Sequence, residues 1–270
     1  MALSDNIFHP FPEKIRIIPY QTFPGPLNMA IDYFLSLNRS AQTMPVLRFY
    51  GWKPYCLSIG FHQQWQAIDT ERLSADGFEF TRRPTGGRAI FHAEELTYSV
   101  HFPKNQVKQQ PLYRFFHQLF SSTLLQLGYP VELKDDTEKL PALSGQSFDY
   151  PCFTKSAQTE VQSGGKKLIG SAQKIFTDCI LQHGSILVGD AHKRLAAYLK
   201  LSESERQKVV QEMEEKSVSL ERLSDRKISA PELMTAIVNQ LELLTNISVN
   251  WQDLDQFEID SAKYYLSQFG

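Results

Sequence analysis

The sequence predicts an α+β fold, because strand-like runs dominate the chain up to about residue 190 and helical patterns dominate after it. A doubly wound parallel fold would instead alternate strands and helices along the whole chain. The composition is that of a folded globular protein, since 42% of the 270 residues are hydrophobic, 12% are aromatic and 21% are charged. The length suits one large domain or two small ones, and neither an internal repeat nor a low-complexity linker divides the chain.

Local patterns predict each element of the first half. Strands are expected where β-branched and aromatic residues cluster, at 14–20, 46–52, 56–61, 78–83 and 95–103. Helices are expected where apolar residues recur at helical spacing, at 25–40, 67–77 and 111–128. The third of these helices is the clearest, because a proline stands near its start and a glycine at its end.

The second half begins with a loop and ends with helices. Residues 134–150 are polar and turn-rich, which predicts a long loop of the kind that compact domains often use for function. Gly164-Gly165 separates two strand-like runs and predicts a β-hairpin in which Lys167 lies across from Gln162. The remaining expected elements are a strand at 179–189, helices at 190–200, 203–216 and 229–244, a strand at "ISVNW" and a last helix at 255–268.

Charge and hydropathy exclude several classes of protein. The formal net charge is −2, with 28 basic against 30 acidic residues, so the chain has no global basic field for nucleic acid. The N-terminus lacks the basic and apolar regions of a secretory signal, and no apolar run approaches the ~18 residues of a membrane span. We therefore expect a cytoplasmic protein with no nucleic-acid or membrane partner.

The three cysteines are Cys56, Cys152 and Cys179. Their odd number and the lack of a CxxC pair indicate neither a disulfide framework nor a zinc site, and the histidines show no zinc-type spacing, so no metal is expected. Cys56 and Cys179 fall on apolar strands and are expected in the core. Cys152 has two interpretations: a small buried hydrophobe, or a nucleophile whose thiolate needs a nearby cation.

Lys167 begins the second arm of the hairpin, next to a small and apolar run. It either faces solvent or points into a cleft, where its ammonium would polarise a carbonyl or exchange a proton with an amine. Hairpin pairing alone does not bring Cys152 to Lys167. A shared site requires the chain to bend between Phe153 and Gln158.

The stretch "TRRPTGGRAIFH", residues 81–92, gathers three arginines around Gly86-Gly87. It predicts either a loop that binds an anion or carboxylate, or a surface turn with solvated arginines. It is neither a Walker A motif nor a GxGxxG motif. His92 and His183 suit either a core position or a site, and Gly184 inside a strand indicates close approach of a ligand or another backbone.

Taken in order along the chain, these motifs resemble the biotin/lipoate protein ligase and octanoyltransferase superfamily. The segments that carry the resemblance are "NMAIDYFL", "RRPTGGRAIFHAEELTYS", "CF", "GGKKLIGSAQ", "LQHGSIL" and "KSVSL". They cover about residues 25–245 and leave the helical tail unassigned. The resemblance implies a single catalytic domain over residues 1–270, with a mixed, largely antiparallel β-sheet flanked by helices.

Within this superfamily, the pattern is most similar to that of the LipM-type octanoyltransferases. Biotin ligases carry a GRGRxGR-type loop that is absent here, and ATP-dependent lipoate ligases carry a third glycine where this chain has Arg88. The run "TKSAQTEV" after Cys152-Phe153 departs from the family pattern, which bears on acyl or acceptor specificity. Glu160, within that run, has no role that the resemblance assigns.

The resemblance implies an enzyme that moves an octanoyl group from octanoyl-acyl carrier protein, through a thioester on Cys152, to a lipoyl-domain lysine. The acceptor would be the glycine-cleavage H protein or a 2-oxoacid dehydrogenase acyltransferase subunit. Lys167 would lower the pKa of Cys152 and polarise the carbonyl, and no cofactor would be needed. The implied substrate-binding residues are Arg82, Arg83, Thr85, Gly86, Gly87, Arg88, His92, Gly170, Ser171, Ala172, His183, Gly184 and Ser185.

Other functions stay open within this resemblance. An ATP-dependent lipoate ligase would use ATP and Mg and would not need Cys152. An amidotransferase would move acyl groups between lipoyl domains, and an inactive homologue would bind them without turnover. In the transferase, Arg82 and Arg83 are expected to dock the acidic carrier protein, so replacing either would weaken use of that donor more than use of a small octanoyl thioester.

Overall fold

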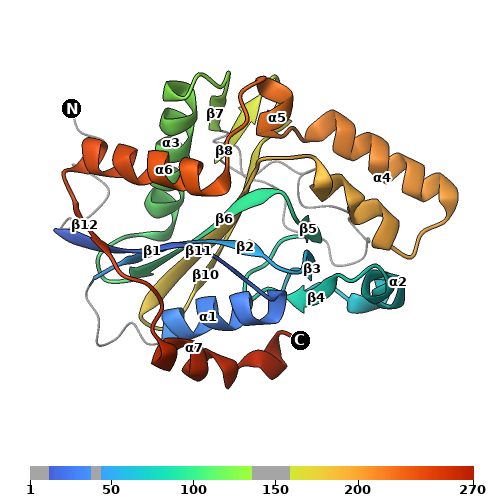
Figure 1. Cartoon of the computed structure of the whole chain (residues 1–270), viewed down its shortest axis with the longest axis horizontal. Helices are drawn as coiled ribbons and strands as arrows, with labels where there is room; N and C mark the ends of the chain where they lie inside the picture. The colour runs from blue at the N-terminus through green and yellow to red at the C-terminus, as the bar shows by residue number, and fades with distance from the viewer. Residues whose placement is uncertain (1–11, 38–43, 136–158) are drawn as a thin grey trace.

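A six-stranded mixed sheet forms the centre of the computed structural model, which describes residues 12–37, 44–135 and 159–270 (Figure 1). In spatial order its strands are β10 (Ile169–Ile175), β11 (Cys179–Leu187), β6 (Glu95–Pro103), β2 (Val46–Trp52), β1 (Lys14–Phe23) and β12 (Ser248–Trp251). The three pairs from β10 to β2 are antiparallel, whereas β1 runs parallel to both β2 and β12. The α+β class and the mixed, largely antiparallel sheet are therefore confirmed.

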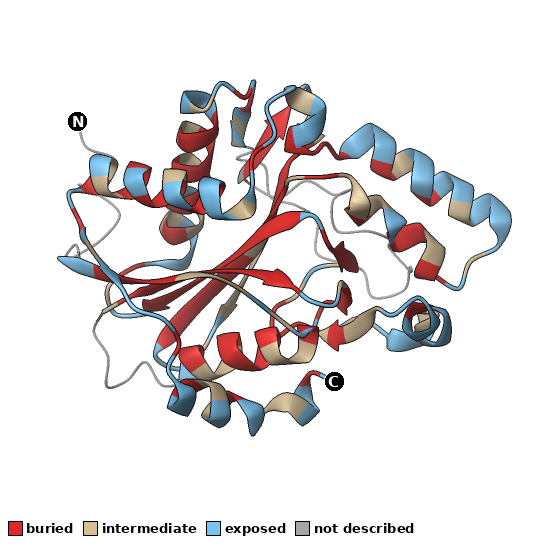
Figure 2. Cartoon of the chain, viewed as in Figure 1, coloured by how far each residue is buried: buried red, intermediate tan, exposed pale blue. Residues whose placement is uncertain are grey.

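Helices cover both faces of this sheet. α1 (Gly25–Leu37) and α7 (Gln256–Lys263) lie on one face, and α3 (Gln109–Gln126) and α6 (Ala230–Thr245) lie on the other (Figure 1). Figure 2 shows the buried residues of α1, α3 and α6 on the side that faces the strands, as an amphipathic pattern requires. β6 lies inside the sheet, and all of its residues are buried. None of the described helices is long and apolar enough to span a membrane.

Two three-stranded sheets accompany the main one. β4 (Glu79–Arg82), β3 (Cys56–Ile59) and β5 (Ile90–His92) form a sheet that packs against η3 (Ala191–Tyr198) and α4 (Glu203–Lys216). The second comprises β7 (Glu132–Asp135), β8 (Thr159–Ser163) and β9 (Lys166–Lys167). The remaining elements are η1 (Trp65–Ala67), α2 (Thr70–Ala75), α5 (Leu220–Leu223) and η4 (Leu266–Gln268).

Side-chain caps fix the starts of α4, α6 and α7. Ser202, Ser229 and Asp255 each accept a hydrogen bond from the backbone N–H three residues later, where a glutamate returns the bond. α6 ends at Asn246, whose φ of 56° is left-handed. Because these signals are local, each helix begins within one residue of its expected start.

Two expected helices differ from the structure. Residues 191–198 form a 3₁₀-helix, and the side chain of Asp190 does not cap it, because it accepts hydrogen bonds from Lys193, Ser219 and Arg222 instead. The helix expected from residue 67 begins at Thr70, because the side chain of Asp69 caps its first turn.

Smaller differences concern the boundaries of elements. The strand expected at 56–61 ends at Ile59, and the last expected helix divides into α7 and η4. The expected loop at 134–150 overlaps the end of β7, and its residues from 136 onward lie outside the described residues, as do residues 38–40 of the first expected helix.

The tail beyond residue 245, which the resemblance left unassigned, is part of the fold. β12 adds an edge strand beside β1, and α7 packs against α1. Buried Arg16 donates to Glu258 of α7 at 2.6 Å, and Thr81 donates to the carbonyl oxygen of Phe269 at 2.7 Å. The tail therefore covers the sheet face that also carries α1.

Candidate active site

Two cross-strand rows on the α1 face of the main sheet bring the motif residues together. Strand pairing aligns the first row as Gly170, Ser185, Thr97 and Tyr50. It aligns the second row as Ala172, His183, Ser99 and Arg48. The GSAQ and HGS segments therefore lie side by side, because β10 and β11 pair in this register.

Asp32 of α1 holds the second row from the helix side. It accepts hydrogen bonds from Arg48 Nη1 at 2.7 Å, Ser99 Oγ at 2.8 Å and Tyr50 OH at 2.9 Å. His183 Nδ1 lies 3.4 Å from Asp32 Oδ2. Burial raises the pKa of Asp32, but the Arg48 guanidinium and the hydrogen bonds from two histidines outweigh burial and hold that pKa well below its usual range. Asp32 is therefore a carboxylate that joins α1 to the sheet.

A chain of hydrogen bonds runs from Arg83 to Glu95. Arg83 Nη1 donates to Ser58 Oγ at 2.6 Å, and Ser58 Oγ lies 2.6 Å from His92 Nε2. His92 Nδ1 lies 2.7 Å from Glu95 Oε1. Burial lowers the pKa of His92, so the ring is neutral, and the carboxylate on its other side assigns the proton to Nδ1. Because Ser58 is fully buried, this Ser–His–Glu chain orients the His92 ring instead of supplying a nucleophile.

The two adjacent arginines of the glycine loop are structural donors. Arg83 is 3% exposed and also donates to the carbonyl oxygen of Arg88 at 2.7 Å. Arg82 is half-buried and donates to the carbonyl oxygens of Phe61 and Gln63 at 2.8 Å each. For Arg83, both the carrier-docking expectation and the solvated-turn interpretation are wrong, because a buried guanidinium bonded to its own loop is not available to a partner.

Thr85 connects the loop to the second row. Its Oγ1 lies 2.6 Å from Nε2 of His183, and burial lowers the pKa of that histidine. Packing requires a glycine at the neighbouring position 184, because a Cβ on Gly184 would lie 2.5 Å from the Gly170 carbonyl oxygen and from Ser171 Oγ. The close approach that this glycine predicted is therefore the approach of β10 to β11.

Lys167 is buried and paired with Glu160. Its side chain is 7% exposed, and Nζ donates to Glu160 Oε1 at 2.7 Å, while Gln162 donates to the other oxygen of Glu160 at 2.8 Å. The expected pairing of Lys167 with Gln162 is confirmed, and the solvent-facing interpretation of Lys167 is wrong. Cys152 lies outside the described residues, as does the bend expected between it and the hairpin, so its approach to Lys167 stays a prediction.

A cavity of about 20 Å³, here called the inner cavity, lies over the two rows. The expected substrate-binding residues that line it are Arg83, His92, Gly170, Ser171, Ala172, His183, Gly184 and Ser185. The other lining residues are Met29, Tyr50, Trp52, Ile90 and Thr97. Of the remaining expected residues, Thr85 contacts His183, whereas Arg82 at the end of β4 and Gly86, Gly87 and Arg88 of the loop do not line the cavity.

Several residues of this site were not predicted from the sequence. Asp32 and Glu95 organise its two hydrogen-bond networks, and Glu160 holds Lys167. The His92–Glu95 pair has a local signal, a spacing of three residues across the turn that enters β6. Glu160 has a local signal as well. Gln162 is paired with Lys167, and Glu160, two residues before Gln162 on the same strand, lies on the same face of that strand. The described residues contain no group of three or more His, Cys, Asp or Glu side chains placed to hold a metal ion.

The two site histidines predict a loss of stability in mild acid. The pKa values of His92 and His183 are lowered in the folded state, so below about pH 6.5 the unfolded chain binds protons that the folded chain does not. The free energy of unfolding should therefore be highest above that pH and fall as pH decreases, by up to about 1.4 kcal/mol per pH unit for each histidine. Urea unfolding across this range measures the slope, and a flat profile between about pH 7 and pH 5 contradicts the assignment of neutral rings.

Comparison with known proteins places the chain in a family. The family model of the lipoyl protein ligase A/B catalytic domain matches residues 24–242. Octanoyltransferase LipM of Kyrpidia tusciae is 34% identical over 250 residues, covering 90% of this chain and 91% of the relative. Octanoyltransferase LipM of Bacillus subtilis is 32% identical over 256 residues, covering 92% of each. A solved chain of a bi-partite lipoate protein ligase and its E2 lipoyl domain from Thermoplasma acidophilum has a TM-score of 0.75 at 21% identity, covering 96% of this chain and 93% of that chain. The chain belongs to the lipoyl protein ligase A/B catalytic domain family and is an acyltransferase.

Proposed function

We propose that the protein transfers an octanoyl group from octanoyl-acyl carrier protein to a lysine of a lipoyl domain, through a thioester on Cys152, in the cytoplasm. Relatives named octanoyltransferase LipM match about nine-tenths of both chains, which supports octanoyl transfer in lipoate biosynthesis. The structural observation that carries the proposal is the buried Lys167–Glu160 pair, whose lysine stands three residues before the GSAQ segment that lines the inner cavity together with the HGS segment.

The inner cavity suits an acyl chain more than a polar ligand. Met29, Tyr50 and Ile90 bring apolar surface to it, and the first row supplies Gly170 at the β10 side. β9 leads into β10 after one residue, so Lys167 lies at that same side of the cavity. An octanoyl chain over the first row would have its carbonyl toward Lys167 and its methyl end toward β2.

In the proposed first step, the Cys152 thiolate attacks the carbonyl carbon of the donor thioester. A new carbon–sulfur bond forms, the bond to the carrier's thiol breaks, and the departing thiolate takes up one proton. Lys167 supplies a positive charge that favours the Cys152 thiolate and a hydrogen bond for the oxyanion. Glu160 keeps the ammonium of Lys167 in place at 2.7 Å.

In the second step, the acceptor lysine attacks the acyl-enzyme as a neutral amine. The amide bond forms as the bond to Cys152 breaks, and one proton leaves the amine nitrogen. The thioester already activates the acyl group, so neither ATP nor a metal is required. This distinguishes the transferase from a lipoate ligase, which must first activate a free acid.

A transfer assay without ATP tests the proposal. The protein is mixed with octanoyl-acyl carrier protein and an unmodified lipoyl-domain protein, and the mass of the acceptor is measured. We expect one octanoyl group on the acceptor, lost in Cys152→Ser. Modification that needs ATP and free lipoate, and that persists in Cys152→Ser, would identify a ligase instead. An acceptor that stays unmodified under both conditions would indicate a homologue that binds without turnover.

Arg83→Met should impair both large and small acyl donors by the same factor. Arg83 lines the inner cavity and supports the loop from inside, so its loss disturbs acyl binding, by up to about 10²-fold in rate. Rates with octanoyl-acyl carrier protein and with octanoyl-pantetheine give the comparison, and Arg82→Met serves as the half-buried neighbour. A loss confined to the carrier-protein donor would show that Arg83 acts in docking after all.

A further inference from the structure

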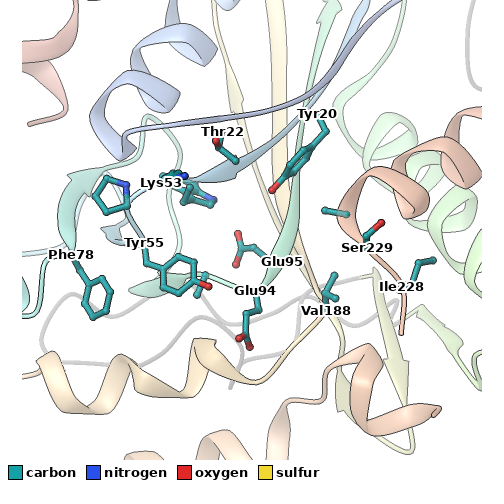
Figure 3. Close-up of a pocket in the computed structure, with 14 residues that line it drawn as sticks. Tyr20, Thr22, Lys53, Tyr55, Phe78, Glu94, Glu95, Val188, Ile228 and Ser229 are labelled. Atoms are coloured by element: carbon teal, nitrogen blue, oxygen red, sulfur yellow. The ribbon is translucent and has the colours of Figure 1, made fainter. Parts of the chain in front are cut away.

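We propose that Trp52 sets the length of the acyl chain that the enzyme accepts, and that the space behind Trp52 is a second acyl subsite. The inference rests on the proposed function, because it places an acyl chain in the inner cavity. A much larger cavity of about 590 Å³, here called the outer cavity, is shown in Figure 3. Of the described residues that line these two cavities, Trp52 is the one that lines both.

Trp52 is held as a wall between the cavities. It is 4% exposed, and its Nε1 donates to Thr97 Oγ1 at 2.7 Å. Its ring stacks on His92, with 4.0 Å between ring centroids and 13° between planes. Ser58 and Glu95 in turn fix the orientation of the His92 ring, because each lies within hydrogen-bond distance of one of its two nitrogens. The indole is therefore fixed by polar contacts as well as by packing.

The strand order places Trp52 at the far end of the acyl site. Lys167 leads into β10, and β10 lies three strand spacings, or about 14 Å, from β2, the strand that ends at Trp52. The first row, from Gly170 to Tyr50, spans this distance. A chain whose carbonyl is near Lys167 therefore directs its methyl end at Trp52.

Among the described side chains that line the inner cavity, Trp52 is the one that also borders the outer cavity. The inner cavity has room for about one water molecule, so an acyl chain must displace lining side chains. Met29 of α1 and Tyr50 of β2 are fully buried in the core, and Thr97 donates a hydrogen bond to Glu95 of the same strand. Behind Trp52 lies the outer cavity, so truncating this side chain joins the two spaces.

The outer cavity offers apolar surface to a longer chain. Figure 3 shows Tyr55 and Phe78 on one side of it and Val188 and Ile228 on the other. Lys53 and Glu94 also line it, so the cavity is not uniformly apolar. The methylenes of a chain longer than octanoyl would be buried against the aromatic and aliphatic side chains.

The test compares chain lengths in variants of Trp52. Octanoate and dodecanoate binding is measured by calorimetry, and acyl-enzyme formation from octanoyl- and dodecanoyl-acyl carrier protein is measured by intact mass. In Trp52→Ala, the preference for dodecanoyl over octanoyl should rise at least about tenfold relative to wild type, in both measurements. Trp52→Phe keeps an aromatic wall and should keep the wild-type preference.

A second substitution closes the space again. Ala230 lines the outer cavity only, so Trp52→Ala/Ala230→Phe should return the preference toward octanoyl. Phe257→Ala removes an aromatic side chain that is 74% exposed on α7 and should change nothing. If Trp52→Ala does not fold, Trp52→Leu opens the wall in part and should shift the preference in the same direction.

An unchanged chain-length preference in a folded Trp52 variant overturns the inference. So does a shift toward dodecanoyl that Ala230→Phe does not reverse. A wild-type protein that forms no acyl-enzyme with any donor overturns the proposed function instead. In that case, the fatty-acid binding ratios still support or contradict Trp52 as the wall.

Discussion

Replacing Lys167 with methionine is expected to lower the rate of octanoyl transfer about 10²- to 10⁴-fold. Methionine is a similarly long side chain without the charge, so the substitution removes the ammonium and fills much of the same space. The expected loss has a physical reason: the site would lose both the cation that favours a thiolate and the donor for the oxyanion. Transfer to a lipoyl-domain protein in the absence of ATP provides the rate.

A matched double variant separates catalysis from stability. Lys167→Met alone leaves Glu160 as a buried carboxylate without its cation, which should destabilise the fold by about 3–5 kcal/mol. Lys167→Met/Glu160→Gln removes both charges and should recover much of that stability, but none of the activity. If the double variant regains activity together with stability, Lys167 has only a structural role.

The reactivity of Cys152 gives an independent measure of the same effect. In the wild-type protein, alkylation by iodoacetamide should become rapid at lower pH than for an ordinary thiol, and in Lys167→Met the profile should shift to higher pH. Cys56 and Cys179 are buried, so in the folded protein they should contribute little to the reaction. Identical profiles in the two proteins would contradict a contact between Lys167 and Cys152.

Replacing Asp32 with asparagine is expected to destabilise the fold by about 3–5 kcal/mol. Arg48 is 1% exposed and donates to Asp32 at 2.7 Å, so the variant leaves a buried guanidinium without its carboxylate. Tyr50 and Ser99 lose a charged acceptor at the same time. The free energy of unfolding in urea measures the effect.

An exposed ion pair offers the matched control. Lys263 donates to Asp260 at 2.8 Å on the surface of α7, and both side chains are about half-exposed. Asp260→Asn should change the free energy of unfolding by about 1 kcal/mol or less. Equal effects of Asp32→Asn and Asp260→Asn would show that burial of the Asp32–Arg48 pair does not determine its contribution.

Features with local causes could be predicted from the sequence. The hairpin at Gly164-Gly165 placed Lys167 across from Gln162, because two glycines with positive φ, 55° and 75°, make the turn. The starts of α4 and α6 were predicted to within one residue, and each has a local cause in the structure, a serine cap with a glutamate three residues later. These signals act over a few residues and need no tertiary information.

Features that depend on packing between distant elements could not be predicted. Asp32 and Arg48 form a hydrogen bond because α1 packs on β2. The sequence around either residue contains no pattern that predicts the other as its partner. Arg83 was expected to dock the acidic carrier protein, yet it is buried under its own loop. The position of Trp52 between two cavities depends on how β2 ends beside β5 and β6, which no periodicity encodes.

Formation of an acyl-enzyme tests the central claim most directly. The protein is mixed with octanoyl-acyl carrier protein, without ATP or acceptor, and its intact mass is measured. We predict a single octanoyl adduct that is absent in Cys152→Ala and retained in Cys179→Ala, whose cysteine is buried in β11. An adduct that persists in Cys152→Ala would contradict the account. So would the absence of any adduct in a protein that modifies a lipoyl domain when given lipoate and ATP.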